Sequence, residues 1–241
     1  MYKFTMYRDK IEINEKLRSS IMAAISKFNP ADPTGRNILL AAREITIEPG
    51  YTFALTDCNL TMAGDLVDTS KGTIDISITV QALTGQIGNF GKSVGVICKS
   101  WGGIKVNLKG STGGPGLMGQ PGVHGKNGVG QPGKNNGGDG GKGGKGGTGC
   151  TGGMGGFVSA YFLNKLTPNA TDLSGVVLDG GDGGSGGPGG PGGAGGSGEE
   201  WCKPNGTFCM MGTNGKQGAK GDPGVKGAKG VNGGPQFSQV M

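Results

Sequence analysis

Glycine recurs at every third position in four separate stretches, and this period constrains the fold more than any other feature of the sequence. Within each stretch the glycines keep one phase, and we call the stretches the first, second, third and fourth glycine segments: residues 110–128, 137–155, 180–198 and 212–233. A polyproline II helix has three residues per turn and makes no internal hydrogen bonds, so its backbone groups must find partners outside. A glycine face lets other backbones approach closely. We therefore expect the four segments to pack side by side.

The second and third glycine segments carry a further glycine stripe, one residue after the first stripe. Two glycine faces allow close neighbours on two sides, so we expect these two segments inside the bundle and the other two outside. A collagen triple helix would use the same period across three chains, but proline is scarce for collagen, at 12 of 241 residues. The stretch "GKQGAKGDPGVKGAKG" in the fourth segment is the best local support for that alternative.

The repeats "GGDGGKGGKGG" and "GGSGGPGGPGGAGG" resemble the polyglycine II bundles of two groups of proteins. These are the springtail antifreeze proteins and the receptor-binding adhesins at the tips of T-even phage long tail fibres. The resemblance covers residues 110–234, about half the chain, and rests on period and composition. It implies a bundle of polyglycine II helices and, for function, receptor binding or ice binding.

The N-terminal region, residues 1–35, is expected to hold one short α-helix. Residues 9–28 place Leu17, Ile21, Ile25 and Phe28 on one helical face, and the following "NPADPTG" is typical of a helix end. The helix most simply packs against its own core; docking to a fibre or another self-assembly partner through this N-terminal region is the alternative.

Residues 36–109 are expected to form a β-domain, because strand patterns follow one another without a helical pattern between them. We favour a small sandwich over a few turns of a β-solenoid. The clearest pattern places alternate residues of "TIDISITV" on one face, and the others are "REITIEPG", "YTFAL", "CNLTMAGDLV", "SVGVICKS" and "IKVNL".

The expected fold class is thus a mainly β N-terminal domain followed by a bundle of polyglycine II helices, with one short N-terminal α-helix. The bundle, residues 110–234, is expected to contain an inserted β-hairpin at residues 157–178, where two apolar runs flank "TPNATD". Residues 235–241 form a tail.

If successive glycine segments alternate in direction, the connectors 129–136 and 199–211 meet at the far end of the bundle. The second connector is expected to be a surface loop, and it carries conspicuous apolar side chains: Trp201, Phe208, Met210 and Met211. A ligand-binding role and a role in capping the end of the bundle explain these side chains equally well. Cys202 and Cys209 frame this loop and could form a disulfide if their Cα atoms lie within about 7 Å.

No motif for catalysis, cofactor binding or metal binding is found. The stretch "GQIGNFGKS" resembles a phosphate-binding loop but has Gln86 where that motif needs glycine, and the single histidine, His124, leaves no set with zinc spacing. Aromatic residues are not interleaved with basic ones as a nucleic-acid platform requires. We therefore expect a protein that is not an enzyme, needs no cofactor and binds no nucleic acid.

The function expected from these features is receptor recognition by an adhesin or fibre tip, through loops at the end of a glycine-rich rod. The receptor would be an outer-membrane protein or a glycan at a cell surface. The alternatives are a structural or assembly protein forming a collagen-like trimer and an ice-binding protein. "MYKFTMYRDK" is not a signal peptide and no apolar run reaches membrane-spanning length, so no membrane insertion is expected. An extracellular protein carried on a virion, which is released by lysis, reconciles a rod-like adhesin with the absent signal.

Overall fold

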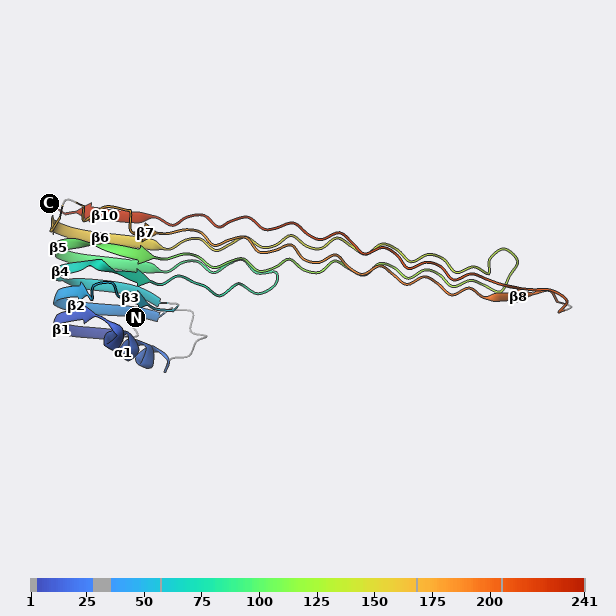
Figure 1. Ribbon diagram of the computed structural model, residues 1–241, viewed down its shortest axis with the longest axis horizontal. Helices are drawn as coiled ribbons and strands as arrows, with labels where there is room; N and C mark the ends of the chain where they lie inside the picture. The colour runs from blue at the N-terminus through green and yellow to red at the C-terminus, as the bar shows by residue number, and fades with distance from the viewer. Residues whose placement is uncertain (1–3, 28–35, 57, 168, 205, 241) are drawn as a thin grey trace.

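The protein is elongated in the computed structural model, which describes residues 4–27, 36–56, 58–167, 169–204 and 206–240. A β-sheet forms one end, called the base, and the glycine segments extend from it to the opposite end (Figure 1). The helix and strands are β1 (Phe4–Ile13), α1 (Glu15–Ile25), β2 (Arg36–Ile47), β3 (Thr52–Ala54), β4 (Cys58–Asp75), β5 (Ser93–Asn107), β6 (Phe157–Lys165), β7 (Val176–Val177), β8 (Glu200–Cys202), β9 (Cys209–Met211) and β10 (Pro235–Gln239).

The base is one eight-stranded sheet in which every pair of strands is parallel. Its main order is β1-β2-β4-β5-β6-β10, while β3 pairs with β4 and β7 pairs with β5. Parallel neighbours need long connections, and three of the connections here are α1 and the paired glycine segments. The first excursion along the rod leaves after β5 and returns the chain to β6, which pairs with β5, and the second leaves after β7 and returns to β10, which pairs with β6.

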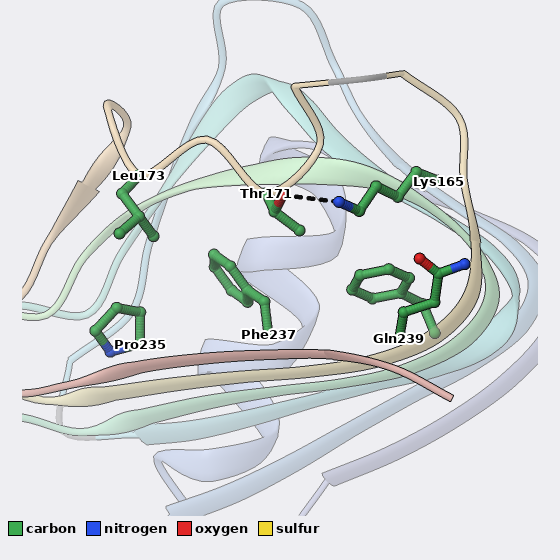
Figure 2. Close-up of a pocket in the computed structure, with 7 residues that line it drawn as sticks. Lys165, Thr171, Leu173, Pro235, Phe237 and Gln239 are labelled. Atoms are coloured by element: carbon green, nitrogen blue, oxygen red, sulfur yellow. Dashed lines mark hydrogen bonds between the residues drawn. The ribbon is translucent and has the colours of Figure 1, made fainter. Parts of the chain in front are cut away.

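The long strand β5 turns back on itself. Its first residue, Ser93, pairs with Phe157, and the residue just before Phe157 donates its N–H to the carbonyl of Leu108, just after β5, at 2.8 Å. Both ends of β5 thus lie beside one point of the chain. Gly103 in the turn has a φ of 108°, a conformation that L side chains rarely adopt. The sheet is consequently bent into two layers that enclose the apolar core, and Figure 2 shows the strands curving around it.

The helix α1 covers the N-terminal end of this core. Asn14 caps it, because its side-chain oxygen accepts a hydrogen bond from the Leu17 N–H at 3.1 Å, and Leu17, Ile21 and Ile25 are buried as expected. The helix begins at Glu15, six residues later than expected, because residues 9–13 belong to β1 and pair with β2. Phe28 and residues 29–35 lie outside the described part of the chain.

The expected fold class was wrong. The structure is a mostly parallel β-sheet with one helix in its described part, and a bundle of polyglycine II helices is not shown, since the described residues of the four glycine segments belong to no helix or strand. The favoured sandwich is also wrong, because the strands pair in parallel within a single sheet. The physical reason is that β6 and β10, from the glycine-rich half, continue the sheet begun in the first half, and β6 buries Val158, Ala160 and Phe162 in the same core.

Two further expectations about strands need correction. Residues 157–178 do not form a β-hairpin: β6 and β7 pair in parallel with the two ends of β5 and not with each other. The strand expected through Val80 ends at Asp75, whose carboxylate accepts hydrogen bonds from the N–H and hydroxyl of Ser77 at 3.0 and 2.7 Å. Val80 is 68% exposed, because the chain leaves the sheet before it.

The four glycine segments are joined laterally by backbone hydrogen bonds that repeat every three residues. Within the described chain, the second and third segments each bond to three other segments, whereas the first and fourth each bond to two. Each of the five bonded pairs of segments is represented by one bond from the N–H of the first residue named to the carbonyl of the second: Gly119 to Pro188 at 2.9 Å, Gly144 to Gln120 at 2.7 Å, Gly143 to Ala219 at 2.9 Å, Gly190 to Gly144 at 2.8 Å and Gly221 to Gly190 at 2.8 Å. The doubled glycine stripe therefore marks the two segments with the most neighbours.

Candidate functional site

The two connectors between glycine segments meet at the end opposite the base, and we call them together the tip: residues 129–136 and 199–211, of which Asn205 is outside the description (Figure 1). The backbone N–H of Glu199 donates to the carbonyl of Asn135 at 2.8 Å. The side-chain amide of Asn135, which is buried, donates to the carbonyl of Met210 at 3.4 Å. The tip is thus a joined structure rather than two separate loops.

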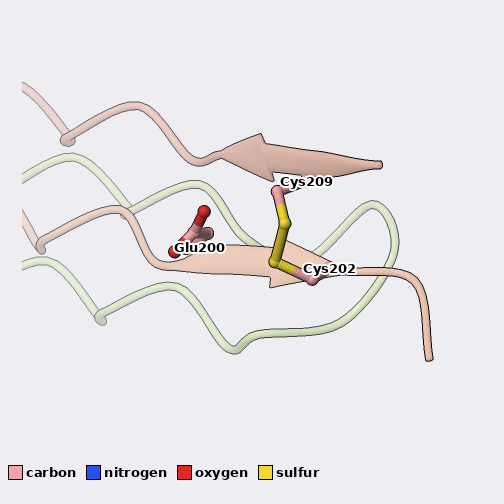
Figure 3. Close-up of side chains that lie close together, drawn as sticks. All are labelled: Glu200, Cys202 and Cys209. Atoms are coloured by element: carbon pink, nitrogen blue, oxygen red, sulfur yellow. A yellow bond between two sulfur atoms is a disulfide. The ribbon is translucent and has the colours of Figure 1, made fainter. Parts of the chain in front are cut away.

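The second connector forms an antiparallel hairpin of β8 and β9, closed by a disulfide between Cys202 and Cys209 (Figure 3). The sequence left this pairing open, and the structure places the two Cα atoms 4.0 Å apart in directly opposite positions. The other cysteines of the described chain, Cys58, Cys98 and Cys150, are in no disulfide. Burial raises the pKa of the Cys98 thiol to about 11, which disfavours the reactive thiolate.

The hairpin presents its candidate binding residues on two faces. Residues directly opposite in an antiparallel pair share a face, so Trp201 lies beside Met210, while Met211 lies beside Glu200 on the disulfide face. Met211 is 72% exposed, Met210 49% and Phe208 48%, whereas Trp201 is half-buried. The structure therefore brings all four predicted residues into one hairpin, with Trp201 the one turned most toward the protein.

The charged groups of the hairpin lie next to its apolar side chains. The Lys203 ammonium is 5.8 Å from the centre of the Phe208 ring, within the range of a cation–π contact. Glu200, Cys202 and Cys209 place their potential ligand atoms within 4.8 Å of one another (Figure 3). The two sulfur atoms are bonded to each other and so are not thiolate ligands, which leaves a single carboxylate for a metal ion.

Clearly shifted pKa values occur at the base and along the rod, in arrangements that hold structure together. The Tyr51 hydroxyl donates to the Glu15 carboxylate at 2.9 Å, joining the start of α1 to the chain before β3. Burial and then this hydrogen bond raise the pKa of Tyr51 to about 12, and the same bond is the main cause of the lowered pKa of Glu15. On the rod, the hydrogen bond from Lys142, at 2.8 Å, lowers the pKa of Asp222.

Sequence reasoning missed one hollow in the base, a pocket between β6, β10 and the loop that precedes β7 (Figure 2). It exists because β10 pairs with β6, although the paired residues are far apart in the sequence. The only signal for β10 is the short run "PQFSQ", which is too brief to predict a strand from period alone.

The chain matches no protein-family model, no curated protein and no solved structure in our comparisons. The resemblance to phage adhesins and antifreeze proteins therefore stays a prediction from the glycine period. Among the described residues, no helix is long and apolar enough to cross a membrane.

Proposed function

We propose that this protein is a non-enzymatic binding protein that recognises a receptor at a cell surface through its tip, as an adhesin or fibre tip does. The proposal rests on the disulfide-closed hairpin, which exposes Phe208, Met210 and Met211 at the end farthest from the base. Exposed apolar side chains on a closed hairpin lose little conformational freedom on binding, because the disulfide already restricts the loop. The rod holds the tip at the end of the molecule opposite the base (Figure 1), and a glycine segment of 19 residues can extend to about 65 Å.

A purely capping role accounts for only part of the tip. The half-buried Trp201 and the bond from Asn135 to Met210 suit a cap over the ends of the segments. Met211 and Phe208 cover no such ends, because they are exposed. We infer that Trp201 and Asn135 hold the hairpin while Phe208, Met210 and Met211 contact the partner.

The two alternative functions are less well supported. In a collagen-like trimer the glycine N–H groups would bond to other chains, but here the repeating glycine N–H groups bond to segments of the same chain. For ice binding, a flat array of small side chains is needed. The row of small residues on the third segment, with Pro188 and Pro191, is bordered by the longer Met118, Gln217 and Lys220.

The receptor that suits this tip is an outer-membrane protein or glycan with an apolar surface, and the base suits attachment to a fibre or virion. Under this proposal the protein lies outside the cell, carried on a virion. The rod has no part in recognition under this proposal beyond its length.

Binding to vesicles of bacterial outer membrane tests the proposal. Truncating Phe208 to alanine should weaken binding by about 2 kcal/mol, roughly 30-fold, if this ring is a buried contact in the complex. Phe90→Ala is the matched control, because Phe90 is a similarly exposed phenylalanine, at 57%, near the base. Met211→Ala and Met118→Ala form a second matched pair, since Met118 is 61% exposed on the rod.

Circular dichroism melts of the same four variants separate binding from folding. The proposal expects unchanged melts and weaker binding only for the two tip variants. Equal binding by tip and control variants, or a lost melt in Phe208→Ala with normal binding by the folded remainder, would show that the tip is a cap.

A further inference from the structure

The two ends of the base are covered differently. At the N-terminal end, α1 lies over the core and buries its apolar face. At the other end, beyond β10, no element of the described chain covers the core, and a pocket of about 430 Å³ opens there (Figure 2). Its lining residues are Phe162, Lys165, Thr171, Leu173, Pro235, Phe237 and Gln239.

The pocket has an apolar floor that continues into the core. The ring of Phe162 is fully buried, and the Trp101 ring stacks on it with centroids 6.2 Å apart. Phe237, on the neighbouring strand β10 and the same side of the sheet, lies 6.3 Å from the same tryptophan. Leu173 stands at the rim and is 50% exposed. A flat or aromatic side chain entering the pocket would therefore complete an aromatic cluster that is otherwise open.

The pocket also carries a positive charge without a carboxylate beside it. Lys165 donates to the Thr171 hydroxyl at 3.1 Å, and an ammonium group has two further N–H donors. Of the residues that line the pocket, none is acidic. An occupant with a carboxylate next to its apolar side chain would suit both features.

Strand β10 offers an open backbone edge along the same pocket. Val240 donates to Phe162 and Gly234 accepts from Val158, so even-numbered residues of this strand bond to β6. In a parallel ladder the alternate residues point their N–H and C=O groups the other way, so Phe237 and Gln239 present theirs at the open edge.

Charge distinguishes this edge from the opposite edge of the sheet. Natural sheets blunt exposed edges with charged side chains, and β1 has four of them: Arg8, Asp9, Lys10 and Glu12. Strand β10, "PQFSQ", has none. The edge of β10 is therefore the one that can accept a further strand.

An end-to-end stack of copies of this chain fits that end poorly. Stacking copies end to end would bring the outer face of α1 and the edge of β1 against the pocket. That face of α1 is polar, with Glu15, Lys16, Ser19 and Ser20 exposed, and offers no apolar group to the pocket.

We propose that the β10 end of the base binds an extended segment of a partner protein by strand addition. The segment pairs with β10 over about five residues, roughly 17 Å, and places one apolar, preferably aromatic, side chain in the pocket. A carboxylate two residues away, on the same face of the added strand, pairs with Lys165. This site is separate from the tip, so it stands or falls independently of receptor recognition.

Peptides of the form fluoresceinyl-Gly-Thr-Glu-Val-Xaa-Val-Thr-amide, in which Xaa is Phe, Trp, Leu or Ala and Glu shares its face of the strand, test the proposal by fluorescence anisotropy with the full chain. The aromatic peptides should bind most tightly and the alanine peptide least. Gln239→Pro removes one outward N–H without touching the bonds to β6, and should weaken binding about fivefold to tenfold. Gln239→Ala is its matched control, because both variants lose the side-chain bond to the Leu163 carbonyl.

The pocket is tested separately with Leu173→Glu, which places a carboxylate at the rim and should weaken binding more than about tenfold. Leu117→Glu, at a leucine 64% exposed on the rod, controls for the added charge. Dichroism melts show whether each variant is folded. The proposal is overturned if no peptide binds up to about 1 mM, if all four bind alike, or if Gln239→Pro and its control behave alike. It is also overturned if sedimentation shows that the chain dimerises through this edge and that Gln239→Pro abolishes the dimer.

Discussion

Replacing Gly146 with valine should destabilise the rod far more than replacing its neighbour Lys145 with valine. A Cβ at Gly146 would lie 2.0 Å from the carbonyl oxygen of Gly187 and 2.8 Å from the amide nitrogen of Gly224. Both are backbone atoms of neighbouring segments, so relief requires whole segments to move apart. Lys145 is exposed, and its side chain points away from these contacts.

The size of the effect follows from the hydrogen bonds at that level of the rod. Moving the second segment away from the third and fourth disrupts two bonds of 2.8 Å, donated by Gly146 to Asp222 and by Gly187 to Gly147. The added Cβ also presses on both atoms of a third 2.8 Å bond, donated by Gly224 to Gly187. Each contributes about 0.5–1.5 kcal/mol, and the loss of glycine freedom in the unfolded chain returns about 0.4–1 kcal/mol. The net loss is about 1–4 kcal/mol, or a fall of roughly 3–15 °C in Tm for a chain of this size. Lys145→Val should change stability by less than about 0.5 kcal/mol.

A thermal melt followed by circular dichroism measures both variants, and Gly146→Ala provides a smaller side chain at the same site. We expect Lys145→Val to have the highest Tm, Gly146→Ala an intermediate Tm and Gly146→Val the lowest. Equal Tm values for the two valine variants would refute the reasoning, because they would mean that the lateral contact at Gly146 contributes nothing. A Tm that climbs with protein concentration would instead indicate association between chains.

Two further predictions concern groups outside the rod. The pKa of Tyr51 is raised in the folded protein to about 12 from 10.0, so its stabilising contribution is complete below pH 10 and is lost as the pH rises toward 12; a tyrosinate absorbance titration should show a transition near pH 12 that Tyr51→Phe removes. Reducing the disulfide between Cys202 and Cys209 should destabilise the hairpin locally by about 2.5 kcal/mol, from the chain entropy of the short loop that it closes. Amide exchange of Lys203, whose N–H donates to Phe208 at 2.9 Å, should then accelerate while the melt of the base is unchanged.

The sequence predicts interactions with a short repeat better than pairings between distant residues. The doubled glycine stripe indicated which segments have the most neighbours, because each period of three carries the same contact. The start of α1 was misplaced because Ile11 and Ile13 alternate as a strand, and their partner β2 lies beyond the helix. The parallel sheet was missed because β6 and β10 find their partners only after the chain has run out along the rod and back.

At the tip, composition alone drew attention to a connector that the structure folds into a hairpin. The grouping of Trp201, Phe208, Met210 and Met211 around two cysteines on a connector is a local pattern, and the structure places them together. Their division into two faces depends on the register of β8 and β9, which no local pattern fixes. The pocket beside β10 had no signal in the sequence, since it arises from the uncovered end of a sheet whose strands come from both halves.

The lateral bonds of the rod have a mechanical consequence. A pull on the tip along the long axis acts through two connectors, each returning to the base, so four segments share the tension. The hydrogen bonds run across that axis and repeat at every third residue, so sliding one segment past another strains the whole series together rather than opening it one bond at a time. A molecule of this build resists stretching along its length, while a force that peels an outer segment sideways meets its bonds singly.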